Sequence, residues 1–209
     1  MRPADIRGPV NNPRLADGHT EPPMRSISIR QPWVWAILQG QKVVDSRSWG
    51  TSLGPVAIHA ATRWDSNAVD SIPMREAWAL HQMGMGPDGV GEFHHSNPLF
   101  PTGVILGVVD IVDVHLVDPV RGCHREVDAL GCVAPIDGSD PADDGWEPRF
   151  CSPWGHVPDR PTHGNERGLK HLVLANPRLL AEPMPFTGHL NIRKLPVGFE
   201  TDIRNGLLP

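Results

Sequence analysis

The sequence has no basic surplus, no long apolar run and few cysteines, and each absence excludes a class of protein. Its 209 residues carry a formal net charge of -5, whereas proteins that depend mainly on phosphate contacts are usually basic. Any contact with nucleic acid must therefore be local, or the ligand must be small. No segment approaches the length of a membrane span. Neither a secretion signal nor an evenly paired cysteine framework is visible, so a reducing cytoplasm is the expected location.

Several motifs are missing as well. A glycine-rich phosphate loop and a Gly-x-Ser-x-Gly elbow do not occur, which sets hydride-transfer and kinase chemistry aside. There is no internal repeat and no alternation of strands with crossover helices. By contrast, the 23 prolines and 21 glycines are many, while apolar residues make up only 39%. This composition indicates a compact β-rich body with long irregular loops.

Local patterns predict about six short strands, an early helix and a second helical piece. The helix begins at Pro32 and ends at Gly40, and the second piece lies in the first half of residues 64–100. Alternation and β-branched apolar composition place strands at 26–30, 42–49, 53–61, 103–117, 171–177 and 188–195. The run 103–117 is the most apolar of the chain and is expected to be a long central strand that bends at Gly107. In the last strand, Leu190 and Ile192 are expected to point inward.

The predicted fold class is mainly β with α (α+β), a small and largely closed β structure flanked by helices. Residues 1–23 are expected to be a disordered leader, because they contain almost no large apolar residues. Met24 is a second plausible start of translation. A single domain is expected over 24–200, with a loop-rich insertion at about 118–168 (the excursion) and a tail over 201–209.

The stretch from Ser26 to Trp49 combines three tryptophans with several fixed charges, as the wall of a pocket would. On a strand, Asp45, Arg47 and Trp49 point the same way, so the carboxylate can orient the guanidinium. An arginine fork suits a phosphate or the acceptor edge of a base. Lys42 lies at the helix–strand junction, and partial burial there would lower its pKa and let it act as base or nucleophile.

The tryptophans Trp33, Trp35 and Trp49 offer stacking surface for a base. The alternative for Trp33 is a place in the core, because it is spaced four residues from an aliphatic side chain. An Asp–Arg pair on a strand is also often a simple surface ion pair. Arg30 is a secondary candidate for ligand binding, and His59 is interpreted as a satisfied interior histidine.

The segment "SISIRQPWVWAILQGQKVVDSRSW", followed by "GPVAIHAA", resembles the ASCH domain, a branch of the PUA-like superfamily. The family's Gly-x-Lys-x-x-Glu-x-Arg signature is matched here from Gly40 to Arg47, with Asp45 in the glutamate position. The closing segment "HLVLANPRLLAEPMPFTGHLNIRKLP" resembles the end of the family branch that opens with an "RQPW" segment. Together the similarity covers Met24 to Pro196, apart from most of residues 118–168.

The resemblance implies a PUA-like β-barrel with a cleft beside the first helix, suited to RNA or a nucleobase. Some ASCH proteins resemble nucleic-acid-binding modules. A small bacterial group hydrolyses the amide of N4-acetylcytidine with the signature lysine, a threonine three positions on and a later glutamate. Lys42 matches that lysine, Asp45 stands at the threonine position, and the glutamate has no assigned counterpart.

We therefore expect a protein that binds RNA or a modified nucleoside, without a cofactor. The expected ligand-binding residues are Arg30, Trp33, Lys42, Asp45, Arg47 and Trp49. The alternatives are an amidohydrolase acting on N4-acylated cytidine-type nucleosides, or a ribonuclease, with Lys42 and Asp45 catalytic. The oligomeric state is left open.

The excursion contains all three cysteines together with several histidines. Cys123, Cys132, Cys151 and His156 form an alternative set of zinc ligands, and a bound metal would order a loop too polar to pack alone. No Cys-x2-Cys pair occurs, so the other interpretation is three thiols and nearby loop histidines without metal. The segment "CSPWG" (151–155) is interpreted as a turn that places Trp154 over the barrel.

Overall fold

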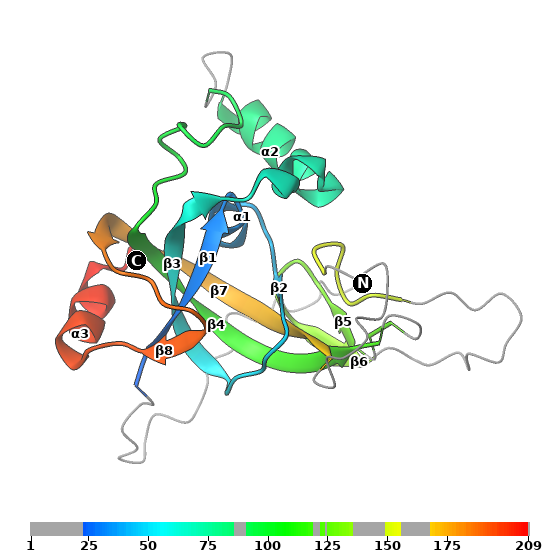
Figure 1. The fold of residues 1–209 in the computed structure, drawn as a ribbon. Coiled ribbons are helices and arrows are strands. Elements are labelled where there is room, and N and C mark those ends of the chain that lie inside the picture. The colour runs from blue at the N-terminus through cyan, green and yellow to red at the C-terminus, as the bar shows by residue number, and fades with distance from the viewer. Residues whose placement is uncertain are drawn as a thin grey trace, which may run out of the picture.

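The computed structural model describes residues 23–85, 91–118, 122–123, 125–135, 149–155 and 168–208. The elements, in chain order, are β1 (Arg25–Gln31), α1 (Trp33–Leu38), β2 (Val44–Arg47), β3 (Gly54–Trp64), the 3-10 helix η1 (Ser66–Asp70), α2 (Ile72–Met85), β4 (Val104–Val117), β5 (Arg125–Val127), β6 (Val133–Pro135), β7 (Leu169–Pro185), β8 (Ile192–Lys194) and α3 (Val197–Gly206). Figure 1 shows their arrangement.

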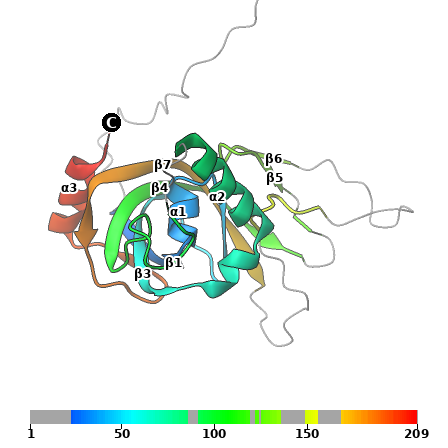
Figure 2. The same ribbon diagram turned by 90° about the horizontal axis from the view of Figure 1, so that it is seen from above.

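Six of these strands form one sheet, in the order β2-β7-β4-β3-β1-β8. β1 and β3 run parallel, and the other neighbouring pairs are antiparallel. β5 and β6 form a separate hairpin inside the excursion. Strands and helices together confirm the α+β fold class predicted from the sequence, with a strongly curled sheet and helices on its outside and in its concave interior (Figures 1 and 2).

The curl of the sheet comes mainly from its two longest strands, β4 and β7. Their ladder shifts register three times, the first time between Ile105 and Gly107, and such irregularities bend a strand pair. A Cβ atom on Gly107 would lie 2.4 Å from the carbonyl oxygen of Arg178, so glycine is needed for this close approach. The bend predicted at Gly107 is therefore confirmed, and Figure 2 shows β4 and β7 curving around α1.

Side chains, rather than a ladder, connect the β2 end of the curled sheet with β1. Arg47 Nη2 donates to the carbonyl oxygen of Ser28 at 3.4 Å. The Arg25 guanidinium donates to the Ser52 hydroxyl at 2.8 Å and to the Leu53 carbonyl at 3.2 Å, just beyond β2. These bonds connect the edge strand β2 with β1, the next-to-last strand at the other side of the sheet, and give the molecule its barrel-like shape.

Helix α1 fills the inside of this curled sheet. Val34, Ile37 and Leu38 pack in the inner core with strand residues, while Trp35 and Ala36 face α2 and pack near Met74 and Trp78. All five residues from Val34 to Leu38 are buried. A helix that is apolar all round belongs in the interior, so α1 is a plug between the sheet and α2.

The C-terminal region differs from the sequence-based expectation. The predicted strand over 188–195 is limited to β8, and Leu190 is 88% exposed instead of pointing inward. The neighbouring Asn191 has a positive φ of 64°, so the chain turns there and the alternation is broken. Residues 201–206, predicted as tail, belong to α3, whose buried Ile203 packs against the sheet near Leu180.

The predicted leader lies outside the described residues except for its last residue, Pro23. Met24 is buried at 1% exposure, and its amide nitrogen donates to Glu200 Oε2 in α3 at 3.0 Å. The start of the described chain is thus attached to its last helix. No helix in the described ranges is both long and apolar enough to cross a membrane.

Candidate functional site

The site is centred on the turn between α1 and β2. Gly40 N donates to the Ala36 carbonyl at 3.0 Å, and Lys42 N donates to the same oxygen at 2.8 Å. A Cβ atom on Gly40 would lie 2.8 Å from Ala36 Cα, so the turn requires a glycine. Gln41 has a φ of 62°. This tight reversal is the reason why Lys42 enters the interior instead of following the strand alternation.

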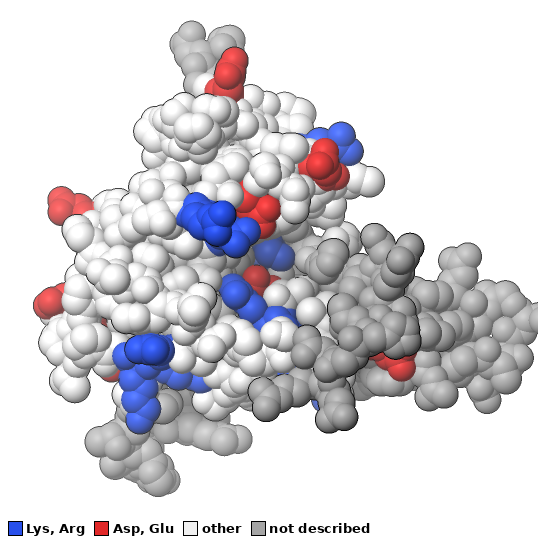
Figure 3. All heavy atoms as spheres, in the orientation of Figure 1, with Lys and Arg blue, Asp and Glu red and all other residues white. Residues whose placement is uncertain are grey.

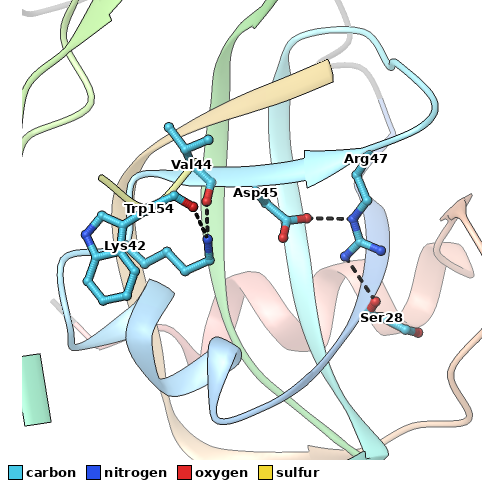
Figure 4. A network of polar contacts seen from close by, with 6 residues as sticks. All are labelled: Ser28, Lys42, Val44, Asp45, Arg47 and Trp154. Carbon is cyan, nitrogen blue, oxygen red and sulfur yellow. Dashed lines mark hydrogen bonds and ion pairs between the residues drawn. The ribbon is translucent and has the colours of Figure 1, made fainter. Parts of the chain in front are cut away.

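The Lys42 ammonium is enclosed by backbone carbonyls and aromatic rings. Its Nζ donates to the carbonyl oxygen of Val44 and, at 3.3 Å, to that of Trp154 (Figure 4). The same nitrogen lies 5.3 Å from the centroid of the Trp33 ring and 5.7 Å from that of Trp154, within the range of cation–π attraction. Lys42 is only 6% exposed. The side chain is therefore held in one place.

Burial lowers the pKa of Lys42 from its usual 10.5 to about 8. The charge of Arg47 lowers this pKa further, while Asp45 and Cys151 oppose the shift. Desolvation has this effect because it disfavours the charged form of a group. Near neutral pH a fraction of the molecules therefore carry a neutral amine, which is the form that acts as a base or nucleophile.

Arg47 and Asp45 form an ion pair on β2, as the sequence predicts. Arg47 Nε lies 2.6 Å from Asp45 Oδ2, and the arginine side chain is 24% exposed against 11% for the aspartate. The guanidinium also lies 5.6 Å from the centroid of the Trp49 ring. Figure 4 shows the carboxylate directed at the guanidinium, which in turn reaches towards Ser28. Asp45 thus orients the arginine fork beside a flat aromatic surface.

The remaining predicted residues are distributed differently. Trp33 is half-buried, packs against two core clusters and donates from Nε1 to Asp65 Oδ2 at 3.1 Å. Trp35 is buried in the core at 2% exposure, so the prediction that it offers stacking surface is wrong.

Arg30 is exposed at the end of β1 and does not enter the hydrogen-bonded group of Figure 4. His59 is an interior histidine, with Nδ1 3.0 Å from Ser28 Oγ, but it is satisfied only in part, because its buried Nε2 has no hydrogen-bond partner among the described residues.

Trp154 is the part of the site that comes from farthest along the chain. Gly155 N donates to the Ser152 carbonyl at 3.0 Å, so "CSPWG" forms a turn. Trp154 lies 112 residues from Lys42 and contacts it with both its carbonyl and its ring. The only sequence signal for this contact is the turn itself, because nothing local connects it to the α1–β2 junction.

Trp154 also lines a cavity of about 480 Å³. It is lined by residues of the α1–β2 turn such as Gln41 and Val43, by α2 and by the excursion, but it does not include Lys42, Asp45 or Arg47. The site around Lys42 and this cavity are thus neighbours that share Trp154. On the face seen in Figure 3, basic and acidic atoms gather in the middle, below α2.

The cysteines are arranged differently from the predicted zinc set. Cys132 is exposed and lies outside a group of described residues that consists of the half-buried His115 and the buried Cys123, Cys151 and His171. The sequence could not identify the two histidines, because they belong to strands rather than to the excursion. His156, the fourth member of the predicted set, lies outside the described residues.

The chain is similar to known proteins both in its structure and in its sequence pattern. A solved structure of a mutant ASCH protein from Zymomonas mobilis is similar over 90% of this chain and 100% of its own, with a TM-score of 0.43 and 10% identity. The ASCH domain pattern matches residues 27–155, which includes Trp154 in the excursion, a part that the sequence resemblance left out. Since the match covers more than half of its 209 residues, the chain belongs to the ASCH domain family.

Proposed function

We propose that this protein binds a nucleoside or a short RNA segment at the site formed by Lys42, Asp45, Arg47 and Trp49. The observation that carries the proposal is the partly exposed Arg47 fork, which Asp45 orients at 2.6 Å and Trp49 flanks at 5.6 Å. An oriented guanidinium recognises a phosphate or the acceptor edge of a base, and an aromatic face stacks on any base. The Arg47 side chain is 24% exposed and Trp49 is half-buried, so a ligand can reach the guanidinium and the ring, whereas Lys42 and Asp45 are buried.

A small ligand or a short segment suits the charge better than a long nucleic acid. The chain has a net charge of -5, and the Arg47 guanidinium is already paired with Asp45. A long groove would need several phosphate contacts, each of which adds to the salt dependence of binding. Specificity must then come from a single base or nucleoside held near β2.

The second candidate is hydrolysis of an N4-acylated cytidine-type nucleoside, which the lowered pKa of Lys42 favours. In this reaction, neutral Lys42 would take a proton from the attacking water. The new C–O bond would form at the acyl carbon, the bond to N4 would break, and N4 would receive a proton, giving the carboxylic acid and cytidine. Asp45 would fix the positions of the Lys42 and Arg47 side chains relative to each other. Ribonuclease activity would use the same lysine as the base.

Binding measurements with Arg47→Gln test the proposed ligand site. The variant removes the charged fork, and a bidentate contact contributes about 1–3 kcal/mol, so affinity for cytidine, N4-acetylcytidine or a short single-stranded RNA should fall about 10- to 100-fold. Arg178→Gln is the matched control, because Arg178 forms a similar ion pair with Asp110 at 2.5 Å on β7 and β4. Equal losses in both variants, or no loss in Arg47→Gln, would contradict a ligand site on β2.

The pH dependence of stability tests the burial of Lys42. Its pKa falls from 10.5 in the unfolded chain to about 8 in the folded protein, so between these values the unfolded chain binds more protons. The free energy of unfolding should therefore rise with pH across this window, by up to about 3 kcal/mol. Urea titrations of the parent protein and Lys42→Met measure it: the parent should gain stability relative to the variant as the pH rises.

The pH dependence of binding and of turnover separates the two candidate functions. If the protonated amine contributes to binding, affinity should fall as the pH rises through about 8. If the neutral amine is the base, kcat/KM should rise to a plateau above that pH. Asp45, Arg47 and Cys151 are the charged or titratable neighbours that influence Lys42, so a profile that moves in Asp45→Asn identifies the lysine as its source.

A further inference from the structure

We infer that His115, Cys123, Cys151 and His171 bind one zinc ion that holds the excursion against the sheet. One ligand atom from each of the four residues lies within 4.8 Å of all the others. Two thiolates and two imidazoles are a common ligand set for structural zinc. This inference does not depend on the proposed ligand at β2.

The two histidines are held together by the sheet itself. His115 of β4 and His171 of β7 are direct partners in the antiparallel ladder, so their side chains lie on one face. Their ring centroids are 5.4 Å apart. The two cysteines approach this pair from the excursion, where Cys123 N donates to the Arg149 carbonyl and Val127 N donates to the Cys151 carbonyl. Four separate segments therefore meet at one point.

The distances fit a single ion after small adjustments, in which the 2.9 Å contact lengthens and the widest separations shorten. His171 Nδ1 lies 2.9 Å from Cys151 Sγ and 3.5 Å from Cys123 Sγ. A tetrahedral zinc with bonds of about 2.0–2.3 Å holds its ligand atoms about 3.3–3.8 Å apart. A separation limit of 4.8 Å leaves room for one metal ion at the centre rather than for a cluster of two.

The orientation of the His115 imidazole is that of a metal ligand. His115 Nδ1 is hydrogen-bonded to Asp113 Oδ2 at 2.8 Å, while its Nε2 is buried and has no hydrogen-bond partner in the described part of the chain. A carboxylate on one ring nitrogen with the other nitrogen free is the arrangement in which histidines bind zinc. Unpartnered buried polar atoms are costly, and an ion would satisfy this one.

Burial indicates a structural role rather than a catalytic one. His171 is fully buried, and Cys123 and Cys151 are 4% and 2% exposed, so four protein ligands would close the coordination sphere without a water. The site also lies three residues before Trp154, whose carbonyl accepts from Lys42. The zinc would therefore fix the turn that encloses the lysine.

Metal analysis of the full-length protein, purified under reducing conditions without a histidine tag or chelator, tests the inference. We expect about one zinc per chain in the parent, and less than a tenth of that in Cys123→Ser and Cys151→Ser. Cys132→Ser is the matched control: it removes the exposed cysteine of the same excursion and should keep the metal. Circular dichroism of each variant establishes whether it is folded.

If the cysteine variants do not fold, the metal-free parent protein provides a second measurement. Chelator-treated parent protein should melt at a temperature lower by about 5 °C or more, and zinc should restore it. Cobalt(II) should give the ligand-field bands of a tetrahedral ion and thiolate charge-transfer bands. The inference is overturned if the parent binds neither metal, if Cys123→Ser and Cys151→Ser keep the zinc, or if the metal-free protein contains a Cys123–Cys151 disulfide.

Discussion

Lys42→Ala should reduce ligand affinity, or kcat/KM if the protein is a hydrolase, by about 100-fold or more. The variant removes a group that the fold holds with two backbone carbonyls and two indole rings. Hydrogen bonds to a charged group contribute about 1.5–3 kcal/mol each, and a missing general base or nucleophile costs about as much or more. Calorimetry with cytidine, N4-acetylcytidine and a short RNA, together with a turnover assay on N4-acetylcytidine, provides the measurement.

Two further variants make this result interpretable. Lys194→Ala removes the same charge from an exposed position on β8 and should change affinity less than twofold. Lys42→Met keeps most of the volume of the side chain, so a loss of function in this variant with an unchanged circular dichroism spectrum would reflect the missing amine rather than misfolding. Normal binding and turnover in both Lys42 variants would exclude a role for this site. Binding without turnover in the parent would support the binding protein over the hydrolase.

Trp35→Ala should destabilise the protein by about 3–5 kcal/mol, as large-to-small substitutions of buried tryptophan do. The Trp35 ring is 2% exposed, and its centroid lies 5.2 Å from that of Trp78 and 6.1 Å from that of Phe100, both edge to face. Since a domain is stable by only about 5–15 kcal/mol, this loss is a large share of the total. For a chain of this size the melting temperature should fall by roughly 10 °C.

Urea denaturation and thermal melts measure the effect. Met83→Ala on α2 is the control, because Met83 is 78% exposed and should change stability by less than about 0.5 kcal/mol. A loss below about 1 kcal/mol in Trp35→Ala would mean that α2 does not pack on α1 through this ring. Ligand binding by the folded fraction should be retained, since Trp35 faces α2 rather than Lys42.

The fold could be predicted from the sequence to the extent that it depends on local patterns. The alternation in "SISIR" corresponds to β1, and the β-branched apolar run over 103–117 corresponds to β4. Gly40 ends α1 because the chain reverses there. Alternation predicted too long a strand at residues 188–195, because the positive φ of Asn191 interrupts the strand there. Helix α3 was missed because its apolar face is small, with Ile203 as its buried residue.

The candidate site, too, could be predicted only in part. The pairing of Asp45 with Arg47 follows from their spacing on one strand, and the family signature identifies Lys42. The roles of the tryptophans do not follow from spacing: Trp33 faces Lys42, while Trp35, two residues on, is enclosed between α1 and α2. A helix that is apolar on every side carries no periodic signal that separates its inner face from the face turned to a neighbouring helix.

The sequence by itself determined where most of the strands lie along the chain, the glycine turn after α1 and the Lys42–Arg47 signature, because these depend on residues that lie close together in the chain. Only the tertiary structure decided that Trp154 covers Lys42 across 112 residues, and that His115 and His171 meet Cys123 and Cys151. These contacts depend on the register of the β4–β7 ladder and on how the excursion folds back over it. Register and docking result from packing between distant segments, for which the local pattern of either segment contains no information.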